Sequence, residues 1–247
     1  MSLTGVYAST AEENFHVRFF VGPPGQGGKR RKEDFPRGPI HPSISPVTRS
    51  GILYLVSGPS GSGKTTLCRR LAQEGLAHYS ISCTTRAPRE GEVNGRDYHF
   101  LTREEFAVEI EAGAFLEHAE VHGNCYGTLI SEVVDFLDRG QDVVMDIDVQ
   151  GAELVRACAD PVIRAALVDL FVMPATDEEL EIRLRGRGTD PEDVIQLRLD
   201  NARTEITHWT GYTYLLLSTD RETDYTRFKN LLLTERMRCA RLTPVSK

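Results

Sequence analysis

The feature that most constrains how this chain folds is an octapeptide that directly follows a short apolar run. Residues 58–65 read Gly-Pro-Ser-Gly-Ser-Gly-Lys-Thr and match the pattern G-x-x-x-x-G-K-[ST] at every position. The run at 52–56 predicts a buried strand before the motif, and residues 67–74 predict a helix after it. This order is typical of a phosphate-binding loop in an α/β protein and disfavours the alternative of an ordinary Gly/Ser turn.

The residues of this loop suit a nucleoside triphosphate. Glycines let backbone N–H groups turn toward an anion, and the helix that begins near Gly63 adds the positive end of its dipole. Lys64 is expected to reach the β- and γ-phosphates, and the hydroxyl of Thr65 to bind Mg²⁺. The residues predicted to bind the triphosphate are Gly58, Pro59, Ser60, Gly61, Ser62, Gly63, Lys64, Thr65 and Thr66.

The bulk properties are those of an ordinary globular protein. Of 247 residues, 40% are hydrophobic and 26% charged, and no apolar run is long enough to cross a bilayer, so no membrane partner is expected. The formal net charge of −7 argues against a nucleic-acid partner held by a broad basic surface. Five scattered cysteines without a C-x-x-C pair predict reduced thiols in the cytoplasm. No pattern predicts an oligomeric state.

Residues 1–50 differ in composition from the rest of the chain. They hold six of the twelve prolines, a basic run at 29–32 and no hydrophobic periodicity, which predicts a disordered extension. The basic run has two readings, a solvated cluster or a binding site for RNA or a partner, and the first is favoured. A transit peptide is disfavoured by Glu12 and Glu13.

From residue 51 onward, apolar runs alternate with helical patterns, as expected for a parallel sheet covered by helices. Strands of one sheet are expected near 52–56, 143–147, 167–172 and 214–217. Helices are expected after capping boxes at Thr102 and Thr176, the first closed by Gly113, and over 191–207 with Asp190 as N-cap and Pro191 at the first helical position. The polar and aromatic segment 80–127 interrupts this alternation and predicts an insertion with a second site.

Two arginines in this insertion suit a phosphate group. Arg86 and Arg89 lie among glycines and a proline, where they can converge on one dianion, and Tyr98 offers a hydroxyl donor to the same group. A merely solvent-exposed loop is the alternative, and the phosphate loop upstream favours the binding site.

Two carboxylates stand at the carboxyl end of a predicted strand, where ligands bind in open α/β sheets. The alternate spacing of Asp146 and Asp148 predicts that they point to opposite faces, so at most one can serve Mg²⁺ through water. For Asp148, capping of a helix that begins near Gln150 is an equally good reading.

A third cluster surrounds a Gly-x-Gly hinge. Arg183, Arg185 and Arg187, with Arg198 one helix later, suggest a mobile flap that brings positive charge over transferring phosphates. For Arg185, neutralisation of a helix C-terminus is the favoured reading.

With these motifs in place, the chain resembles the guanylate kinases, which phosphorylate GMP with ATP. The resemblance extends over 51–240 and is strongest at 84–98, which reads Thr-Thr-Arg-Ala-Pro-Arg-Glu-Gly-Glu-Val-Asn-Gly-Arg-Asp-Tyr. It implies an α/β fold of the P-loop NTPase type, a parallel sheet flanked by helices, in a domain over 51–243. It also implies an inserted GMP-binding subdomain at 82–127 and an arginine-bearing lid at 183–203.

The resemblance further implies roles for single residues. ATP would lie on the phosphate loop, with Mg²⁺ on Thr65 and, through water, on Asp146. The phosphate of GMP would lie on Arg86, Arg89, Tyr98 and Tyr126, and guanine on Ser82, Glu117, Thr128 and Asp148. The residues expected to stabilise the transferring group are Lys64, Arg89, Arg183, Arg187 and Arg198.

One departure and two alternatives accompany this reading. The family usually shows Asn-Asp after its last strand, near the adenine of ATP, whereas this chain has Ser218-Thr219-Asp220, which points to looser donor selectivity. A catalytically silent binding module of the same fold is disfavoured by the intact phosphate loop. A P-loop kinase for another acceptor is disfavoured by Glu117 with Ser82 and Thr128, because a carboxylate and hydroxyls suit guanine.

Overall fold

The computed structural model describes residues 47–121, 123–186 and 191–244. At its centre, a sheet of five parallel strands has the order β10-β9-β2-β8-β3. The strands are β2 (Leu53–Ser57), β3 (His78–Tyr79), β8 (Val143–Asp146), β9 (Leu167–Pro174) and β10 (Tyr214–Ser218). The four strands predicted for one sheet are confirmed, whereas β3 is too short to leave a pattern in the sequence.

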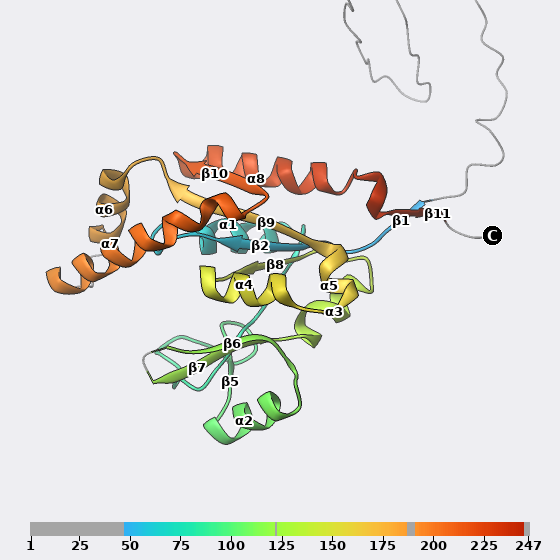
Figure 1. The fold of residues 1–247 in the computed structure, drawn as a ribbon, viewed down its shortest axis with the longest axis horizontal. Helices are drawn as coiled ribbons and strands as arrows, with labels where there is room; N and C mark the ends of the chain where they lie inside the picture. Colours follow the sequence, from blue (N-terminus) through green and yellow to red (C-terminus); the bar gives the residue numbers. More distant parts are fainter. Residues whose placement is uncertain (1–46, 122, 187–190, 245–247) are drawn as a thin grey trace, which may run out of the picture. The chain divides into compact units, whose positions relative to one another are not determined.

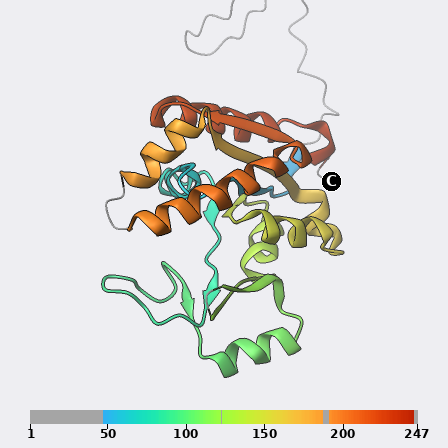
Figure 2. The same ribbon diagram turned by 60° about the vertical axis from the view of Figure 1, so that its left-hand side comes forward.

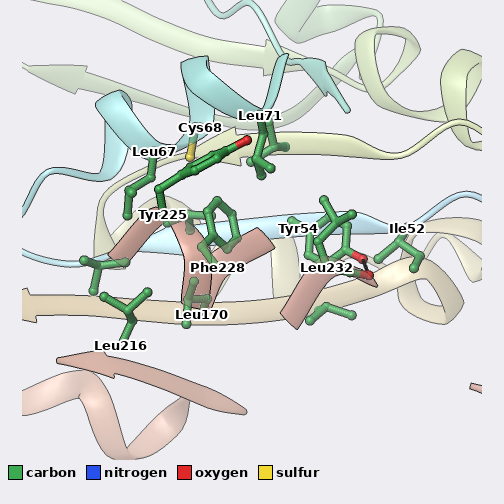
Figure 3. Packing of buried hydrophobic residues seen from close by; sticks show 14 residues of the cluster. Ile52, Tyr54, Leu67, Cys68, Leu71, Leu170, Leu216, Tyr225, Phe228 and Leu232 are labelled. Atoms are coloured by element: carbon green, nitrogen blue, oxygen red, sulfur yellow. Dashed lines mark hydrogen bonds between the residues drawn. The ribbon is translucent and has the colours of Figure 1, made fainter. Parts of the chain in front are cut away.

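Helices cover both faces of this sheet (Figure 1). One face carries α1 (Lys64–Gln73) and α8 (Arg221–Glu235), and the other carries α3 (Ser131–Leu137), α4 (Val149–Ala157) and α5 (Pro161–Ala166). Along β2, Tyr54 packs in the first core, and Leu53 and Leu55 pack in the second, as strand alternation requires. Figure 3 shows the first core, in which the rings of Tyr54 and Phe228 meet edge to face at a centroid distance of 6.5 Å.

The segment predicted as an insertion forms a second sheet of order β5-β4-β7-β6. Its elements are β4 (Cys83–Thr84), β5 (His99–Phe100), α2 (Arg103–Glu111), β6 (Phe115–Val121) and β7 (Asn124–Leu129). Both hydrogen bonds of the predicted capping box at α2 are present, and Gly113, with φ of +65°, follows the helix. Figures 1 and 2 show this sheet and α2 together on one side of the parallel sheet.

Two helices between β9 and β10 form the region predicted as the lid. α6 (Asp177–Arg185) begins after the predicted N-cap, where Thr176 accepts from the N–H of Glu179 at 3.2 Å. α7 (Glu192–Ile206) begins one residue later than predicted, because Pro191 is extended with ψ of 161° and stands at the N-cap position. The predicted cap Asp190 lies outside the described residues. Leu180, Leu184, Ile195, Leu199 and Ala202 form a core between the two helices.

The two ends of the described chain pair with each other. β1 (Val47–Arg49) runs antiparallel to β11 (Leu242–Pro244), which follows the 3₁₀ turn η2 (Cys239–Arg241). The expected disorder of residues 1–50 is therefore wrong at its end, since residues 47–49 form a strand; residues 1–46 lie outside the described part. On this strand, Arg49 donates to the buried carboxylate of Asp142 at 2.5 Å.

All five cysteines are free, as predicted. In the described part of the chain, no helix has both the length and the apolar character that a membrane crossing requires.

Candidate functional site

The phosphate loop connects β2 to α1 and leaves the first turn of the helix open. Gly58 has φ of +141°, and a Cβ there would lie 1.9 Å from the carbonyl oxygen of Val172, so only glycine lets the loop begin this close to β9. Gly63, with φ of +96°, is the N-cap of α1, and no side chain caps the helix. The first N–H groups of α1 are therefore available to an anion.

Two further residues fit the loop to a charged ligand. The ammonium group of Lys64 donates to the carbonyl oxygen of Pro59 at 3.0 Å and to that of Gly58. Burial lowers the pKa of Lys64, and the negative charge of Asp146 opposes this shift. The hydroxyl of Ser62 is buried and has no hydrogen-bond partner among the described residues. A phosphate in the loop would give both groups an acceptor.

Asp146, at the end of β8, faces the loop and meets two hydroxyl groups. Thr65 Oγ1 donates to its Oδ2 at 2.5 Å, and the Tyr79 hydroxyl donates to its Oδ1 at 2.5 Å. Hydroxyl and carboxylate oxygens beside a triphosphate are the donors that Mg²⁺ prefers, so the residues present fit this ion. The sequence did not single out Tyr79, since its strand is only two residues long.

Asp148 is the N-cap of α4 and accepts from the N–H of Gly151 at 2.8 Å. Its reading as a helix cap is confirmed. The strand alternation from which opposite faces were expected for Asp146 and Asp148 does not extend to Asp148, because β8 ends at Asp146. Both carboxylates lie close enough to Lys64 to act on its pKa.

Three residues predicted to read guanine form a chain of hydrogen bonds across the insertion sheet. Thr128 on β7 donates to Glu117 Oε1 on β6 at 2.8 Å, and its hydroxyl lies 3.1 Å from Ser82 Oγ. Burial raises the pKa of Glu117, and the nearby charge of Asp148 adds to the rise, although the bond from Thr128 opposes it. A half-buried carboxylate beside two hydroxyls complements a ring that carries adjacent N–H donors.

Of the residues predicted to bind the phosphate of GMP, three lie close together in the insertion and Arg89 does not join them. Arg86 donates to both oxygens of Glu92 at 2.9 and 3.0 Å and lies 5.4 Å from the centroid of the Tyr98 ring. Tyr98 and Tyr126 meet edge to face with centroids 6.2 Å apart. Arg89 is exposed, and its backbone N–H rather than its guanidinium group joins Glu92, at 2.7 Å.

Glu92 lies inside the motif that carries the resemblance, yet sequence reasoning did not assign it a role. An acidic residue six positions after Arg86 in the same glycine-containing loop was the available signal.

Arg183, in the last turn of α6, reaches the turn between β10 and α8. Its Nη1 donates to Ser218 Oγ at 2.8 Å, and its Nη2 donates to the carbonyl oxygen of Thr219 at 3.2 Å. Nη1 also donates to the carbonyl oxygen of Ser62 in the phosphate loop, at 3.4 Å. This arginine, predicted to belong to the lid, therefore lies beside the phosphate loop.

The other lid arginines differ from Arg183. Arg185 pairs with Glu181 and Glu192, which agrees with a structural role at the helix end. Arg198 lies half-buried on α7. Arg187 lies outside the described residues.

Contacts between polar side chains connect the insertion to the parallel-sheet part. Arg69, on the helix that follows the phosphate loop, pairs with Asp97 of the insertion at 3.6 Å. Glu132 on α3 lies 2.6 Å from His78 Nε2 on β3 and 3.8 Å from His99 Nε2 on β5. The second of these carboxylates therefore links both sheets.

Comparisons with known proteins agree with this arrangement. A family model described as guanylate kinase matches residues 50–235. The chain is 47% identical over 199 residues to the guanylate kinase of Syntrophotalea carbinolica, covering 79% of this chain and 91% of the relative. It is 44% identical over 193 residues to that of Cereibacter sphaeroides, covering 78% and 90%.

A solved structure gives the same answer. The crystal structure of guanylate kinase from Anaplasma phagocytophilum superimposes with a TM-score of 0.64 at 32% identity, covering 81% of this chain and 100% of that one. The predictions of a P-loop α/β fold and of an enzyme are confirmed, and the alternative of a catalytically silent module gains no support. The chain therefore belongs to the guanylate kinase family.

Proposed function

We propose that this chain transfers the γ-phosphoryl group of Mg·ATP to GMP, and also to dGMP, giving ADP and the nucleoside diphosphate. The observation that carries the proposal is the series of hydrogen bonds that joins Ser82, Thr128 and Glu117 in the insertion. An ion pair between Asp97 and Arg69 connects this insertion to the helix that follows the intact phosphate loop. Glu117 offers acceptors to the N1–H and N2–H donors of guanine. Adenine lacks these donors, so a half-buried carboxylate that faced it would stay unpaired.

The reaction requires no general base from the protein, because the phosphate of GMP is already an anionic nucleophile at neutral pH. Catalysis then depends on in-line positioning and on neutralised charge in a water-poor cleft. Mg²⁺, held by Thr65 and through water by Asp146, would supply positive charge to the triphosphate. Lys64 would hold the β- and γ-phosphates from the side of the loop.

The proposal assigns the following sites. Residues 58–66 bind ATP, the insertion 82–127 binds GMP, and the lid 183–203 closes over both. The phosphate of GMP lies on Arg86, Arg89, Tyr98 and Tyr126, guanine lies on Ser82, Glu117, Thr128 and Asp148, and Lys64, Arg89, Arg183, Arg187 and Arg198 stabilise the transferring group. The five free thiols support a cytoplasmic location.

A coupled assay of ADP release with GMP, dGMP, AMP and UMP tests the proposal. GMP and dGMP should be phosphorylated, and AMP and UMP should give rates lower by about a thousandfold or more. Preference for AMP or UMP would make the chain a kinase for another acceptor, and absence of turnover with all four would favour the silent module.

Lys64→Ala is the control for a contaminating kinase and tests the separation of the two subsites. Its turnover should fall by about a thousandfold or more, because a fixed positive charge on the transferring group is lost. Its affinity for GMP should stay the same, and an equally large loss of GMP binding would contradict two separate subsites.

A further inference from the structure

A buried polar pair lies beneath the lid arginine. Ser218 ends β10 and Asp224 lies in the first turn of α8, with exposed fractions of 1% and 5%. Ser218 Oγ donates to Asp224 Oδ2 at 2.6 Å, and Asp224 Oδ1 accepts from the N–H of Thr219 at 2.9 Å. The hydroxyl group of Ser218 has a single proton, which it donates in the hydrogen bond to Asp224. The Ser218 oxygen is therefore left as an acceptor for a third group.

Arg183 is that third group. Its Nη1 donates to Ser218 Oγ at 2.8 Å, and its Nη2 donates to the carbonyl oxygen of Thr219 at 3.2 Å and to Glu179. The buried carboxylate of Asp224 thus acts on the guanidinium group through one hydroxyl. The far end of the Arg183 side chain is fixed by an element outside its own helix, beside the carbonyl oxygen of Ser62 in the phosphate loop.

We propose that Ser218 and Asp224 are positioning residues that hold Arg183 toward ATP in the phosphate loop. An arginine that rotates freely on a helix must be immobilised each time its ligand binds, and this lowers affinity. An arginine that is already held by charge-assisted hydrogen bonds loses less freedom on binding. The pair therefore raises the affinity for the donor nucleotide. This inference rests on the proposed function only in naming ATP as the donor.

A purely structural role of the pair makes a different prediction. If Ser218 and Asp224 only shape the turn into α8, their loss would lower stability and would act on ATP binding independently of Arg183. If they act through Arg183, their loss has no further effect once that side chain is gone.

The test is a double-mutant cycle of ATP affinity, measured by isothermal titration calorimetry with Mg²⁺ on the full chain. Ser218→Ala should weaken ATP binding about tenfold, the size expected for one hydrogen bond to a charged group. Arg183→Ala should weaken it at least as much, and the double variant should bind ATP no more weakly than Arg183→Ala alone. Affinity for GMP should be unchanged throughout.

Ser80→Ala is the matched control, because Ser80 is also a buried serine and its hydroxyl has no partner among the described residues. It should leave ATP affinity unchanged. Asp224→Asn keeps the side-chain volume and turns one acceptor of the carboxylate into a donor, so it should weaken ATP binding in the native background and not beside Arg183→Ala. This variant decides the question if Ser218→Ala does not fold.

Three results would overturn the proposal: unchanged ATP affinity in folded Ser218→Ala, unchanged affinity in Arg183→Ala, or losses that multiply in the double variant. The cycle needs no GMP turnover. A chain that binds ATP with this coupling and does not phosphorylate GMP would refute the proposed function and leave the inference standing.

Discussion

At the scale of single residues, two glutamates of the insertion show that the surroundings of a carboxyl group can raise or lower its pKa. Burial raises the pKa of Glu117, which has hydroxyl neighbours and no cation beside it in the described contacts. The hydrogen bond from Arg86 lowers the pKa of Glu92. Glu92 therefore neutralises an arginine, whereas Glu117 has no cationic partner in the described contacts, as the proposed contact with guanine requires. The sequence identified Glu117 through the resemblance alone, because its neighbours come from other strands.

Glu117→Gln should raise the KM for GMP about a hundredfold and leave the KM for ATP unchanged. The carboxylate of Glu117 can accept from both N–H donors of guanine, whereas an amide has one accepting oxygen and one NH₂ donor. Hydrogen bonds to a charged group also contribute more free energy than those between neutral groups. Initial-rate kinetics with each substrate varied in turn measure both constants. Glu120→Gln, on the same strand and exposed, is the control and should match the native chain. Equal losses for both substrates would contradict a guanine-reading role.

The pH dependence of GMP binding should report Glu117 directly. Because its pKa is raised above 4.5, it takes up a proton at a higher pH than an exposed glutamate does, and the protonated form no longer accepts two N–H bonds. The KM for GMP should therefore rise as the pH falls from neutral. The phosphate of GMP itself titrates at about pH 6. The pH profile of Glu117→Gln, which contains only this phosphate effect, therefore serves as the baseline. Profiles of identical shape would refute this assignment.

At the scale of elements, local signals in the sequence decide where helices begin. Thr102 and Thr176 cap α2 and α6 where the sequence predicted them, because an N-cap depends on residues three positions apart. The start of α7 depends on the backbone of Pro191, whose extended ψ the sequence does not fix. Contacts between elements could not be predicted, because they join residues that lie far apart in the sequence. Tyr79 donates to Asp146, and Arg183 donates to Ser218.

Thr102→Ala should lower the free energy of unfolding by about 1 kcal/mol, because it removes an N-cap and half of the capping box. The helix α2 has a single buried side chain, Phe106, so packing contributes little to hold it in place. Urea unfolding followed by circular dichroism measures the change. Thr226→Ala, an exposed threonine inside α8, is the control and should be neutral or slightly stabilising. A loss of similar size in both variants would speak against the capping box.

At the scale of the whole molecule, buried charges close the described chain at β1 and β11. Asp142, with an exposed fraction of 2%, accepts from Arg49 at 2.5 Å, from Arg236 at 2.8 Å and from the N–H of Ile52 at 3.0 Å. The architecture of the parallel sheet was predictable because hydrophobic runs mark buried strands. This charged cluster was not, since Arg49, Asp142 and Arg236 lie far apart in the sequence.

Deletion of residues 1–50 should lower the free energy of unfolding by about 2 kcal/mol relative to deletion of residues 1–46, because only the longer deletion takes a hydrogen-bonded partner from a buried carboxylate. Paired urea titrations of the two shortened chains measure the difference. Their turnover at a temperature well below unfolding should be equal, since the two chains differ only in residues 47–50, whose described contacts include neither the phosphate loop nor Ser82, Glu117 or Thr128. Equal stabilities would show that Arg49 and β1 contribute nothing.

The insertion sheet has little apolar interior of its own. Among the three large buried clusters of the described chain, it contributes a single residue, Leu116, and its own packing centres on the stacked rings of Phe106 and Phe115, 4.4 Å apart. Regions with so few buried contacts open locally at low free energy, so its amides should exchange with deuterated water faster than those of β2 or β9. A nucleoside monophosphate that binds only the closed sheet should suppress this opening and slow the exchange. Under the proposed function, the acceptor substrate should therefore stabilise the surface that recognises it.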